Sequence, residues 1–418
     1  MKLKRICFAL CACMLWGCAS AASIAESTPV PSETAEAVET AETTPGEEVK
    51  QEENEEPMTV NEQYPLPQSE SLAFTRSLKI GWDLGNTLDA WVTSMPENEL
   101  DTEISWQPVR TTPELIHAVH QAGFETLRVP VSWHNHVQDD GTVSPVFMNR
   151  VKEIVDYGMD EGMYVILNIH HDNNPEFNAV YPDQAHLEQS TAYVKNIWTQ
   201  VCETFRDYDE HLIFEGLNEP RLIGTGIEWV VVPGNKESDE AVQCINALNQ
   251  TFVDTVRSDS GNNTTRWLLV PGYAGSPEGL ASDLYVIPKD PENRVLLECH
   301  AYRPYHFALE PNGTSHYGLP DSNPKEMTDV FDTLYEHFTS KGIGAVIDEF
   351  GAVNRNNNTE DRVRFYEDYV QGAKDRGIPV CVWDNGYMTS GDEIFGMFDR
   401  KTCTVDQTLI DALMKAFR

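Results

Sequence analysis

The feature that most constrains the fold is a series of eight apolar runs that alternate with amphipathic segments from about residue 72 onward. The apolar runs are predicted to be strands, and they span residues 79–86, 124–131, 163–171, 212–219, 266–273, 295–302, 344–351 and 378–385. The amphipathic segments are predicted to be helices, and they span residues 112–121, 144–161, 185–206, 238–257, 327–341, 359–376 and 405–417. Only the interval around residues 276–283 is too short for a full helix.

Near-continuous apolar strands separated by helices are typical of a parallel sheet whose outer face is covered. One such array of roughly 345 residues favours a closed (β/α)₈ barrel over an open, doubly wound sheet. No GxGxxG turn follows the first predicted strand, which argues against a dinucleotide-binding sheet. We therefore predict an α/β protein with a single TIM barrel over residues 71–418.

Residues 1–18 have the anatomy of an export signal. Three basic residues come first, and the apolar stretch from Ile6 to Trp16 is too short to span a bilayer. The run Leu15-Trp16-Gly17-Cys18 resembles the lipobox of bacterial lipoproteins, so Cys18 is the predicted lipidation site. A plain secretory signal is the alternative. The chain is expected to be exported in either case, as a cell-surface or membrane-anchored lipoprotein of a bacterium or as a secreted protein.

Residues 19–70 are rich in Ala, Glu, Ser, Thr and Pro and almost free of aromatic residues. Such a segment buries too little apolar surface to offset its chain entropy, so it is predicted to be a disordered linker. A tether is the favoured role, and an acidic partner-binding tail is the alternative. The formal net charge of −37 argues against nucleic acid or anionic lipid as a partner. Membrane attachment is expected only through the lipid anchor, and the chain is expected to be a monomer.

Five of the nine cysteines lie beyond the signal, and they lack the spacing of a zinc site or a disulfide framework. Cys299 and Cys381 fall inside apolar strands and are expected to be small core residues. A single bridge between Cys202 and Cys244 stays open.

Polar or aromatic residues stand at the ends of nearly all predicted strands. In a (β/α)₈ barrel the catalytic groups collect at the carboxyl ends of the strands. One such ending is usually a capping detail, but the whole set predicts an active site there. The set comprises Asn86, Arg128, His170, His171, Asn218, Glu219, Tyr273, His300, Tyr302, Glu349, Trp383 and Asn385.

Two of these residues, Glu219 in LIFEGLNEPR and Glu349 in AVIDEFG, are carboxylates at the ends of the fourth and seventh strands. These strands are not neighbours, so their ends face each other across the mouth of a barrel. Glycoside hydrolysis uses such a pair, because one carboxyl group protonates the leaving oxygen and the other attacks carbon or activates water. A lone glutamate at a strand end would more often be an ion-pair partner.

Seven segments together resemble glycoside hydrolase family 5. They are GWDLGNTLDA (81–90), RVPVSW (128–133), LNIHHD (167–172), LIFEGLNEPR (212–221), HAYRPY (300–305), IDEFGAVNR (347–355) and WDNG (383–386). The resemblance is strongest to subfamily 4, which contains endo-β-1,4-glucanases and xyloglucanases. It implies a retaining endo-β-1,4-glucanase that hydrolyses internal bonds of plant β-glucans by double displacement, with no cofactor and no metal.

The resemblance also implies roles for single residues. Glu219 matches the acid/base, Glu349 the nucleophile and Asn218 the residue that binds the sugar 2-hydroxyl. Arg128 matches the arginine that keeps the nucleophile ionised. His170, His300 and Tyr302 match residues lining the −1 subsite, and Trp383 matches the aromatic platform beneath it. Asn86, His171 and Asn385 are further substrate-binding candidates at strand ends, together with Trp106 on the long first loop.

Two expectations follow from the chemistry of the pair. Glu219 must carry a proton to donate it, so its pKa is expected to be raised, whereas Glu349 must stay ionised. The two carboxyl groups are expected to lie roughly 5–5.5 Å apart, the separation of retaining enzymes. One departure from the family pattern is Asp83, where the family usually has asparagine; it is expected to leave activity intact and to affect the pH optimum.

Three other interpretations remain. A metal-dependent amidohydrolase-like barrel would use His170, His171, His300 and Glu349 as ligands, but the His-x-His pair expected at its first strand is missing. A surface glycan-binding lipoprotein would hold polysaccharide without cutting it. A β-mannanase or xylanase would share the same fold and catalytic pair.

Overall fold

The computed structural model describes residues 61–391 and 393–418 of the chain. The predicted signal, the lipidation site Cys18 and most of the predicted linker lie outside the described residues. Among the described residues, no helix has both the length and the apolar character needed to cross a membrane.

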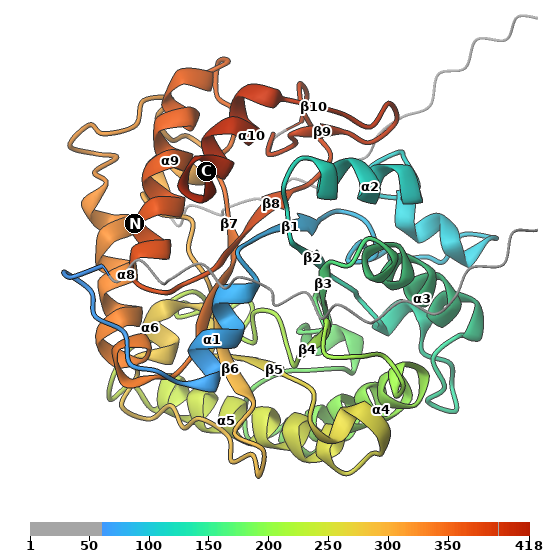
Figure 1. The fold of residues 1–418 in the computed structure, drawn as a ribbon. Helices are drawn as coiled ribbons and strands as arrows, with labels where there is room; N and C mark the ends of the chain where they lie inside the picture. The colour runs from blue at the N-terminus through green and yellow to red at the C-terminus, as the bar shows by residue number, and fades with distance from the viewer. Residues whose placement is uncertain (1–60, 392) are drawn as a thin grey trace, which may run out of the picture. The chain divides into compact units, whose positions relative to one another are not determined.

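Eight parallel strands form a closed barrel in sequence order, with β8 paired to β1 (Figure 1). All eight predicted strands are confirmed, and each observed strand lies inside its predicted range. The strands are β1 Ile80–Leu84, β2 Thr126–Val129, β3 Tyr164–Asn168, β4 Leu212–Glu215, β5 Leu268–Pro271, β6 Val295–His300, β7 Ala345–Phe350 and β8 Val380–Asp384.

Helices follow the strands and cover the outside of the barrel (Figure 1). They are α2 Pro113–Gln121, α3 Pro145–Asp160, α4 Leu187–Phe205, α5 Lys236–Arg257, α6 Pro277–Leu280, α8 Lys325–His337, α9 Thr359–Asp375 and α10 Gln407–Met414. The short interval after β5 holds only the single turn α6, as its length predicted. The short helices α1 Glu70–Ser77 and α7 Tyr305–Ala308 were not predicted, nor was the hairpin of β9 Phe398–Asp399 and β10 Thr404–Val405.

Helix α1 packs at the amino end of the barrel. The ring of Phe74 stacks on Trp267, with ring centroids 4.5 Å apart. Residues 61–69 also lie against the barrel, although they were expected to belong to the linker. The ring of Tyr64 meets Tyr335 edge-on at 5.3 Å and lies 3.9 Å from the guanidinium of Arg376. The folded domain therefore begins before residue 71, because this stretch supplies apolar surface that the barrel buries.

The interior of the barrel changes from apolar to polar along the strands. Ile166, Ile213, Leu296 and Val346 pack in one buried cluster. Side chains two residues further along a strand point the same way, so the next positions form a second layer nearer the carboxyl end. We call it the polar layer, and it contains Asp83, Arg128, Asn168, Glu215, Glu298 and Asp348, all fully buried.

The cysteines are free thiols in the described residues, so the open possibility of a Cys202–Cys244 bridge is not realised. Cys299 and Cys381 are buried, as predicted for core residues.

Candidate active site

Glu349 lies at the end of β7 with both carboxylate oxygens held. Arg128 donates from Nη1 to Oε1 over 2.7 Å, and the hydroxyl of Tyr302 donates to Oε2 over 3.0 Å. Hydrogen bonds from a cation to a carboxylate are short and directional, so they fix its position. The side chain remains 7% exposed at the carboxyl end of the barrel. Its carboxylate is therefore held in one orientation by a donor on each oxygen.

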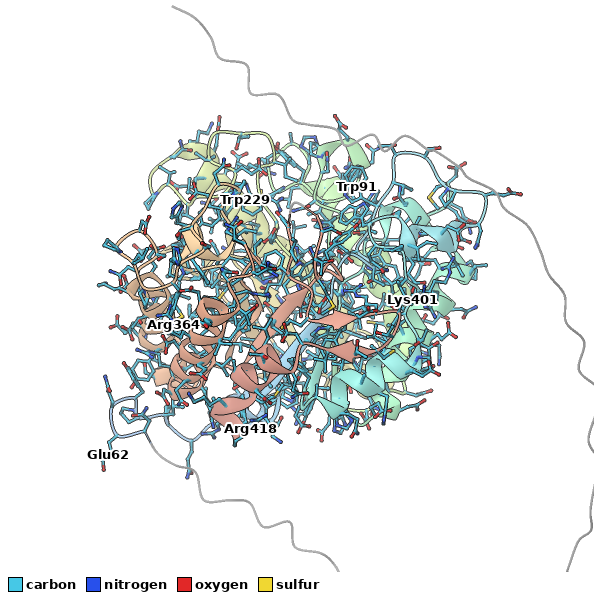
Figure 2. The ribbon with its side chains drawn as sticks, turned by 90° about the horizontal axis from the view of Figure 1, so that it is seen from above. Glu62, Trp91, Trp229, Arg364, Lys401 and Arg418 are labelled. Carbon is cyan, nitrogen blue, oxygen red and sulfur yellow. The ribbon has the colours of Figure 1, made fainter. Side chains whose placement is uncertain are left out.

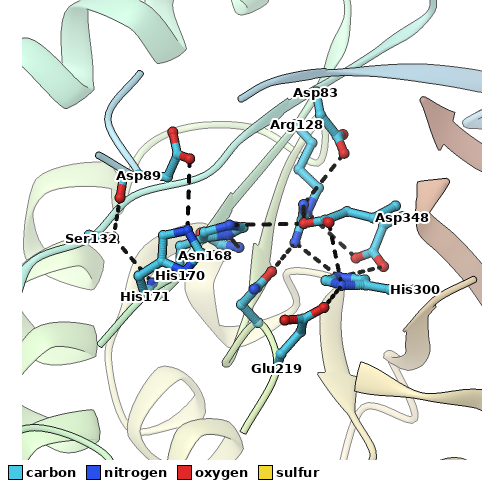
Figure 3. Close-up of polar contacts among 12 residues, drawn as sticks. Asp83, Asp89, Arg128, Ser132, Asn168, His170, His171, Glu219, His300 and Asp348 are labelled. Atoms are coloured by element: carbon cyan, nitrogen blue, oxygen red, sulfur yellow. Dashed lines mark hydrogen bonds and ion pairs between the residues drawn. The ribbon is translucent and has the colours of Figure 1, made fainter. Parts of the chain in front are cut away.

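Arg128 organises the surrounding side chains (Figure 3). Its Nε and Nη2 atoms donate to the two oxygens of Glu215, each over 2.7 Å, and Nη2 also donates to Oδ1 of Asn218 over 2.7 Å. Burial acts to lower the pKa of Arg128, but the charges of Glu215 and Glu349 outweigh it and raise the pKa well above its usual value. Arg128 is thus a permanent cation with a fixed orientation.

Replacing Arg128 by methionine is expected to destabilise the protein by about 3–5 kcal/mol, because it leaves buried Glu215 and Glu349 without their cation. Chemical denaturation monitored by tryptophan fluorescence measures this change. The control is Arg206→Met, which breaks a partly exposed pair with Asp259 and should cost far less, because water screens exposed ion pairs. Equal losses in the two variants would contradict the central role of Arg128.

Glu219 lies beyond the end of β4, and contacts on both sides of its carboxylate orient it. Nδ1 of His300 lies 2.8 Å from Oε1, and Nη1 of Arg221 donates to Oε2 over 3.3 Å. One carboxylate oxygen of Glu219, one of Glu349 and a ring nitrogen of His300 all lie within 4.8 Å of one another. This close approach favours the retaining geometry over the wider spacing of inverting enzymes.

The proton of the Glu219–His300 pair does not reside where the sequence suggested. Burial acts to raise the pKa of Glu219, but the hydrogen bond and charge of His300 outweigh it and lower the pKa to about 2. Burial acts to lower the pKa of His300, but Glu349 and Glu219 raise it to about 9. The expectation of a raised pKa for Glu219 is therefore wrong for the unliganded site. His300, which is distant in sequence, holds the proton on Nδ1, and this nitrogen lies 2.8 Å from Oε1 of Glu219.

Trp383 and His170 form one wall beside Glu349. Their rings are parallel, with centroids 5.9 Å apart, and Nε2 of His170 lies 3.9 Å from Oε1 of Glu349. Asn168 Nδ2 lies 3.1 Å from Nδ1 of His170, so Nδ1 accepts and the ring hydrogen is on Nε2. A Cβ at position 85 would lie 2.5 Å from the ring of Trp383, which explains why Gly85, the second glycine of GWDLGN, has no side chain. These predicted residues are brought together as expected.

The other substrate-binding candidates differ in their placement. Asn218 is buried, and its amide oxygen accepts a hydrogen bond from Arg128. His171 is half-buried between the rings of His170 and Trp106, at 4.4 and 5.4 Å. Asn86 is half-buried in the turn after β1, with a φ of 54°. Trp106 is also half-buried and meets Trp91 edge-on.

Asn385, a further candidate, directly follows β8. Its nitrogen donates to the carbonyl of Glu393, and its oxygen accepts from the backbone N–H groups of Tyr387 and Phe395. The hydrogen bonds of this side chain are therefore directed to the loop after β8.

Several site residues were missed in the sequence. Glu215 and Asn168 are strand residues of the polar layer, and each is linked to Arg128 or to His170 by the hydrogen bonds above. Arg221 contacts both Glu219 and the ring of Trp229, which lies 3.9 Å away. A charged residue at an inward position of an apolar strand was the available signal for Glu215. No local signal marks Arg221.

Asp83, the departure from the family pattern, lies in the polar layer 3.5 Å from Nη1 of Arg128. Burial raises its pKa well above the usual value, even though the charge of Arg128 acts to lower it. Its predicted effect on the pH optimum remains a prediction.

Side chains that could hold a cation form three groups among the described residues: Asp89, His170 and His171; Glu219, His300 and Glu349; and Glu298, His300 and Asp348. The four ligands of the metal-dependent alternative do not come together in one of these groups. The last two groups both face Arg128, whose Nη2 lies 3.5 Å from Nε2 of His300. A second cation there would be repelled by the guanidinium.

Comparisons with known proteins agree with this geometry. A family model described as cellulase (glycosyl hydrolase family 5) matches residues 89–389. Endoglucanase A of Ruminococcus albus is 41% identical over 343 residues, which cover 81% of this chain and 90% of that protein. The structure of a GH5 family lichenase from Caldicellulosiruptor sp. F32 matches with a TM-score of 0.81 and 46% identity, over 84% of this chain and 96% of that one.

A GH5-4 broad specificity endoglucanase from Ruminococcus champanellensis, solved with bound cellotriose, also matches. Its TM-score is 0.76 and its identity 39%, over 84% of this chain and 99% of that one.

Proposed function

The chain belongs to glycoside hydrolase family 5, the cellulase family, and we propose on that basis that it is a retaining endo-β-1,4-glucanase in which Glu349 is the nucleophile and Glu219 the acid/base. The observation that carries this assignment is the facing pair of carboxylates, with oxygens within 4.8 Å of each other and one of them fixed by Arg128 and Tyr302.

The first step forms a covalent glycosyl-enzyme. Glu349 attacks the anomeric carbon, the bond from that carbon to the leaving oxygen breaks, and the proton that His300 shares with Glu219 passes through Glu219 to that oxygen. In the second step Glu219 takes a proton from water, the water oxygen attacks the same carbon, and the bond to Glu349 breaks. Two inversions give net retention. Once Glu349 is a neutral ester, its charge no longer raises the pKa of His300, so the pair can change roles.

Aromatic residues flank the two carboxylates and supply surfaces for sugar rings. Trp383 and His170 lie beside the nucleophile, Trp106 lies beyond His171, and Trp229 stacks on Arg221 next to Glu219. Figure 2 shows Trp91 and Trp229 at the same end of the barrel, away from Glu62 and Arg418. Several rings at one end support binding of a chain of sugars rather than a single residue.

Replacing Trp106 by alanine is expected to raise KM on β-glucan about 5- to 10-fold with little change in kcat. The reason is that the ring would bind ground state and transition state alike, and its loss would cost ~1 kcal/mol. Initial rates on mixed-linkage β-glucan measure both constants. Val286→Ala, at a side chain with 58% exposure, is the control. An unchanged KM in Trp106→Ala would remove this residue from the substrate-binding surface.

The substrate is tested by reducing-sugar release from xyloglucan, mixed-linkage β-glucan, carboxymethylcellulose and mannan. We expect the full-length chain to cleave the three glucans, and NMR of the first product should show the β-anomer. Preference for mannan would favour the mannanase alternative. Binding of glycans without cleavage would favour the surface-binding alternative and refute the catalytic assignment.

We also propose that the enzyme is kept at the cell surface by a lipid on Cys18. The basic start, the short apolar stretch and the Leu-Trp-Gly-Cys run support this proposal. Wild-type protein should partition with membranes and Cys18→Ala should not. A Cys18→Ala variant that stayed in the membrane fraction would refute it.

A further inference from the structure

The polar layer contains more carboxyl groups than its hydrogen-bond donors can serve. Arg128 directs its hydrogen bonds to Glu215, Glu349 and Asn218. Asp83, Glu298 and Asp348 receive none of these hydrogen bonds, and all three are fully buried. Their six carboxyl oxygens have no hydrogen-bond partner among the described residues, except that Glu298 and Asp348 can bond to each other when one of them carries a proton. A buried, unpaired carboxylate is costly, and the group avoids that cost by keeping a proton.

A bulge in β7 brings two of the acids together. Cys299 pairs with Ile347 and His300 pairs with Glu349, so Asp348 has no partner in the register with β6. In a regular strand consecutive side chains point to opposite faces, but the extra residue of a bulge removes that alternation. Asp348 and Glu349 therefore both face Arg128, at 3.7 and 2.7 Å.

Asp348 and Glu298 lie behind the ring of His300 (Figure 3 labels Asp348 and His300). Nε2 of His300 is 3.8 Å from Oδ1 of Asp348 and 3.9 Å from Oε2 of Glu298. On the opposite edge of the ring, Nδ1 is 2.8 Å from Oε1 of Glu219. The two acids thus contact the ring that shares a proton with the acid/base, but neither approaches Glu219 through a direct contact.

The groups around these acids come from most strands of the barrel, and they add up to a strongly acidic environment with one permanent cation. They are Asp83 on β1, Arg128 on β2, Glu215 on β4, His300 on β6, Glu349 on β7 and Cys381 on β8, with Tyr285 nearby. Burial and then the charges of Asp348 and Glu215 raise the pKa of Glu298 well above its usual value. Burial and then Glu215 raise the pKa of Asp348 to about 7.

We propose that Glu298 and Asp348 are positioning residues for acid catalysis, and that they work as neutral, protonated acids behind His300. This proposal rests on the proposed function. The proton leaves Nδ1 of His300 for Glu219, which produces a neutral imidazole and a carboxylic acid. Glu219 then passes that proton to the leaving oxygen as the bond to the anomeric carbon breaks. An ionised carboxylate at Nε2 would instead hold the proton on the ring, because it is nearer to His300 than to Glu219.

The test compares wild type with Asp348→Asn and Glu298→Gln, which keep the shape of each side chain and remove its ionisation. The measurement is kcat/KM against pH on cellotetraose and on an aryl cellobioside with a good leaving group. On cellotetraose we expect wild-type activity to fall above about pH 7, where Asp348 ionises. We call this fall in kcat/KM the alkaline limb of the pH profile. In Asp348→Asn the alkaline limb should lie about 1 pH unit higher than in wild type. On the aryl cellobioside, which needs no proton, the alkaline limb should stay in place.

Asp290→Asn is the matched control, since Asp290 is also buried but is paired with Arg257 outside the site. It is expected to lose stability without moving the alkaline limb. Two readouts report protonation apart from activity: the infrared band of protonated carboxyl groups, which should weaken in Asp348→Asn, and Tm against pH. Acids with raised pKa values stabilise the fold fully at low pH and lose that contribution as the pH rises through the folded-state pKa. Tm of wild type should therefore fall as the pH rises from about 4 to about 7, the ordinary and the folded-state pKa of Asp348, and less so in Asp348→Asn.

Superimposed cellotetraose profiles for wild type and both variants would overturn the proposal. So would an equal shift on both substrates, which would indicate a general effect on the site. Mass spectrometry that found one stoichiometric metal ion in wild type and none in the variants would also overturn the proposal. A bound cation, not protons, would then balance the charge of these acids. A wild type that cleaves no β-glucan would overturn the proposed function itself, and the infrared band would still decide whether these acids carry protons.

Discussion

Replacement of Glu349 by alanine is expected to lower kcat/KM on mixed-linkage β-glucan by at least ~10⁴-fold, the order of loss seen when the nucleophile of a covalent mechanism is removed. Arg128 and Tyr302 then have no carboxylate to orient, and no other described carboxylate outside the buried polar layer contacts Arg128. Assay of reducing sugars over long incubation times measures the residual rate.

Added azide distinguishes the loss of the nucleophile from misfolding. The small anion can enter the space of the missing carboxylate and attack an activated aryl glycoside from that face, which gives the α-glycosyl azide. Glu310→Ala, an acid with 44% side-chain exposure, is the control and should retain wild-type rates. Activity of Glu349→Ala within tenfold of wild type, or a β-glycosyl azide, would refute the role of Glu349.

Replacement of Glu219 by alanine should lower kcat/KM on β-glucan by ~10²–10⁴-fold, the usual contribution of general acid–base catalysis. On an aryl cellobioside with a good leaving group the first step should be nearly unchanged, because the leaving oxygen needs no proton. The glycosyl-enzyme should then accumulate, since no base activates water. Rapid-mixing measurements should show a burst of the released phenol, followed by a slow steady state.

Azide again identifies the role, with the opposite stereochemistry. It attacks the accumulated glycosyl-enzyme where water would, so the product expected from Glu219→Ala is the β-glycosyl azide. Glu228→Ala, which removes the other acid on Arg221, serves as the neighbouring control and should change rates only a few-fold. Loss of rate that is equal for good and poor leaving groups would contradict an acid role for Glu219.

The strands and the catalytic pair could be predicted because each has a local signal. Buried parallel strands are apolar throughout, and helices between them keep one apolar face, so the order of elements follows from hydrophobic periodicity alone. A carboxylate at the end of an apolar strand is equally local. Glu219 and Glu349 were therefore found together with Arg128, His170, His300, Tyr302 and Trp383, all of which the structure brings to one end of the barrel.

The errors share a different cause, namely contacts between segments that are distant in sequence. Tyr64 belongs to the domain because Tyr335 and Arg376 pack on it. The pKa of Glu219 is lowered rather than raised, because His300 of β6 meets it.

By itself the sequence determined the eight-stranded α/β barrel, its family and the two glutamates, because hydrophobic period and strand-end residues are properties of short segments. Only the tertiary structure decided how protons and charges are shared. Alternation predicts opposite faces for Asp348 and Glu349, whereas the bulge in β7 turns both toward Arg128. Closure of the barrel then places acids from β1, β4, β6 and β7 around one guanidinium, and the electrostatic energy of such a cluster depends on distances that no single segment sets.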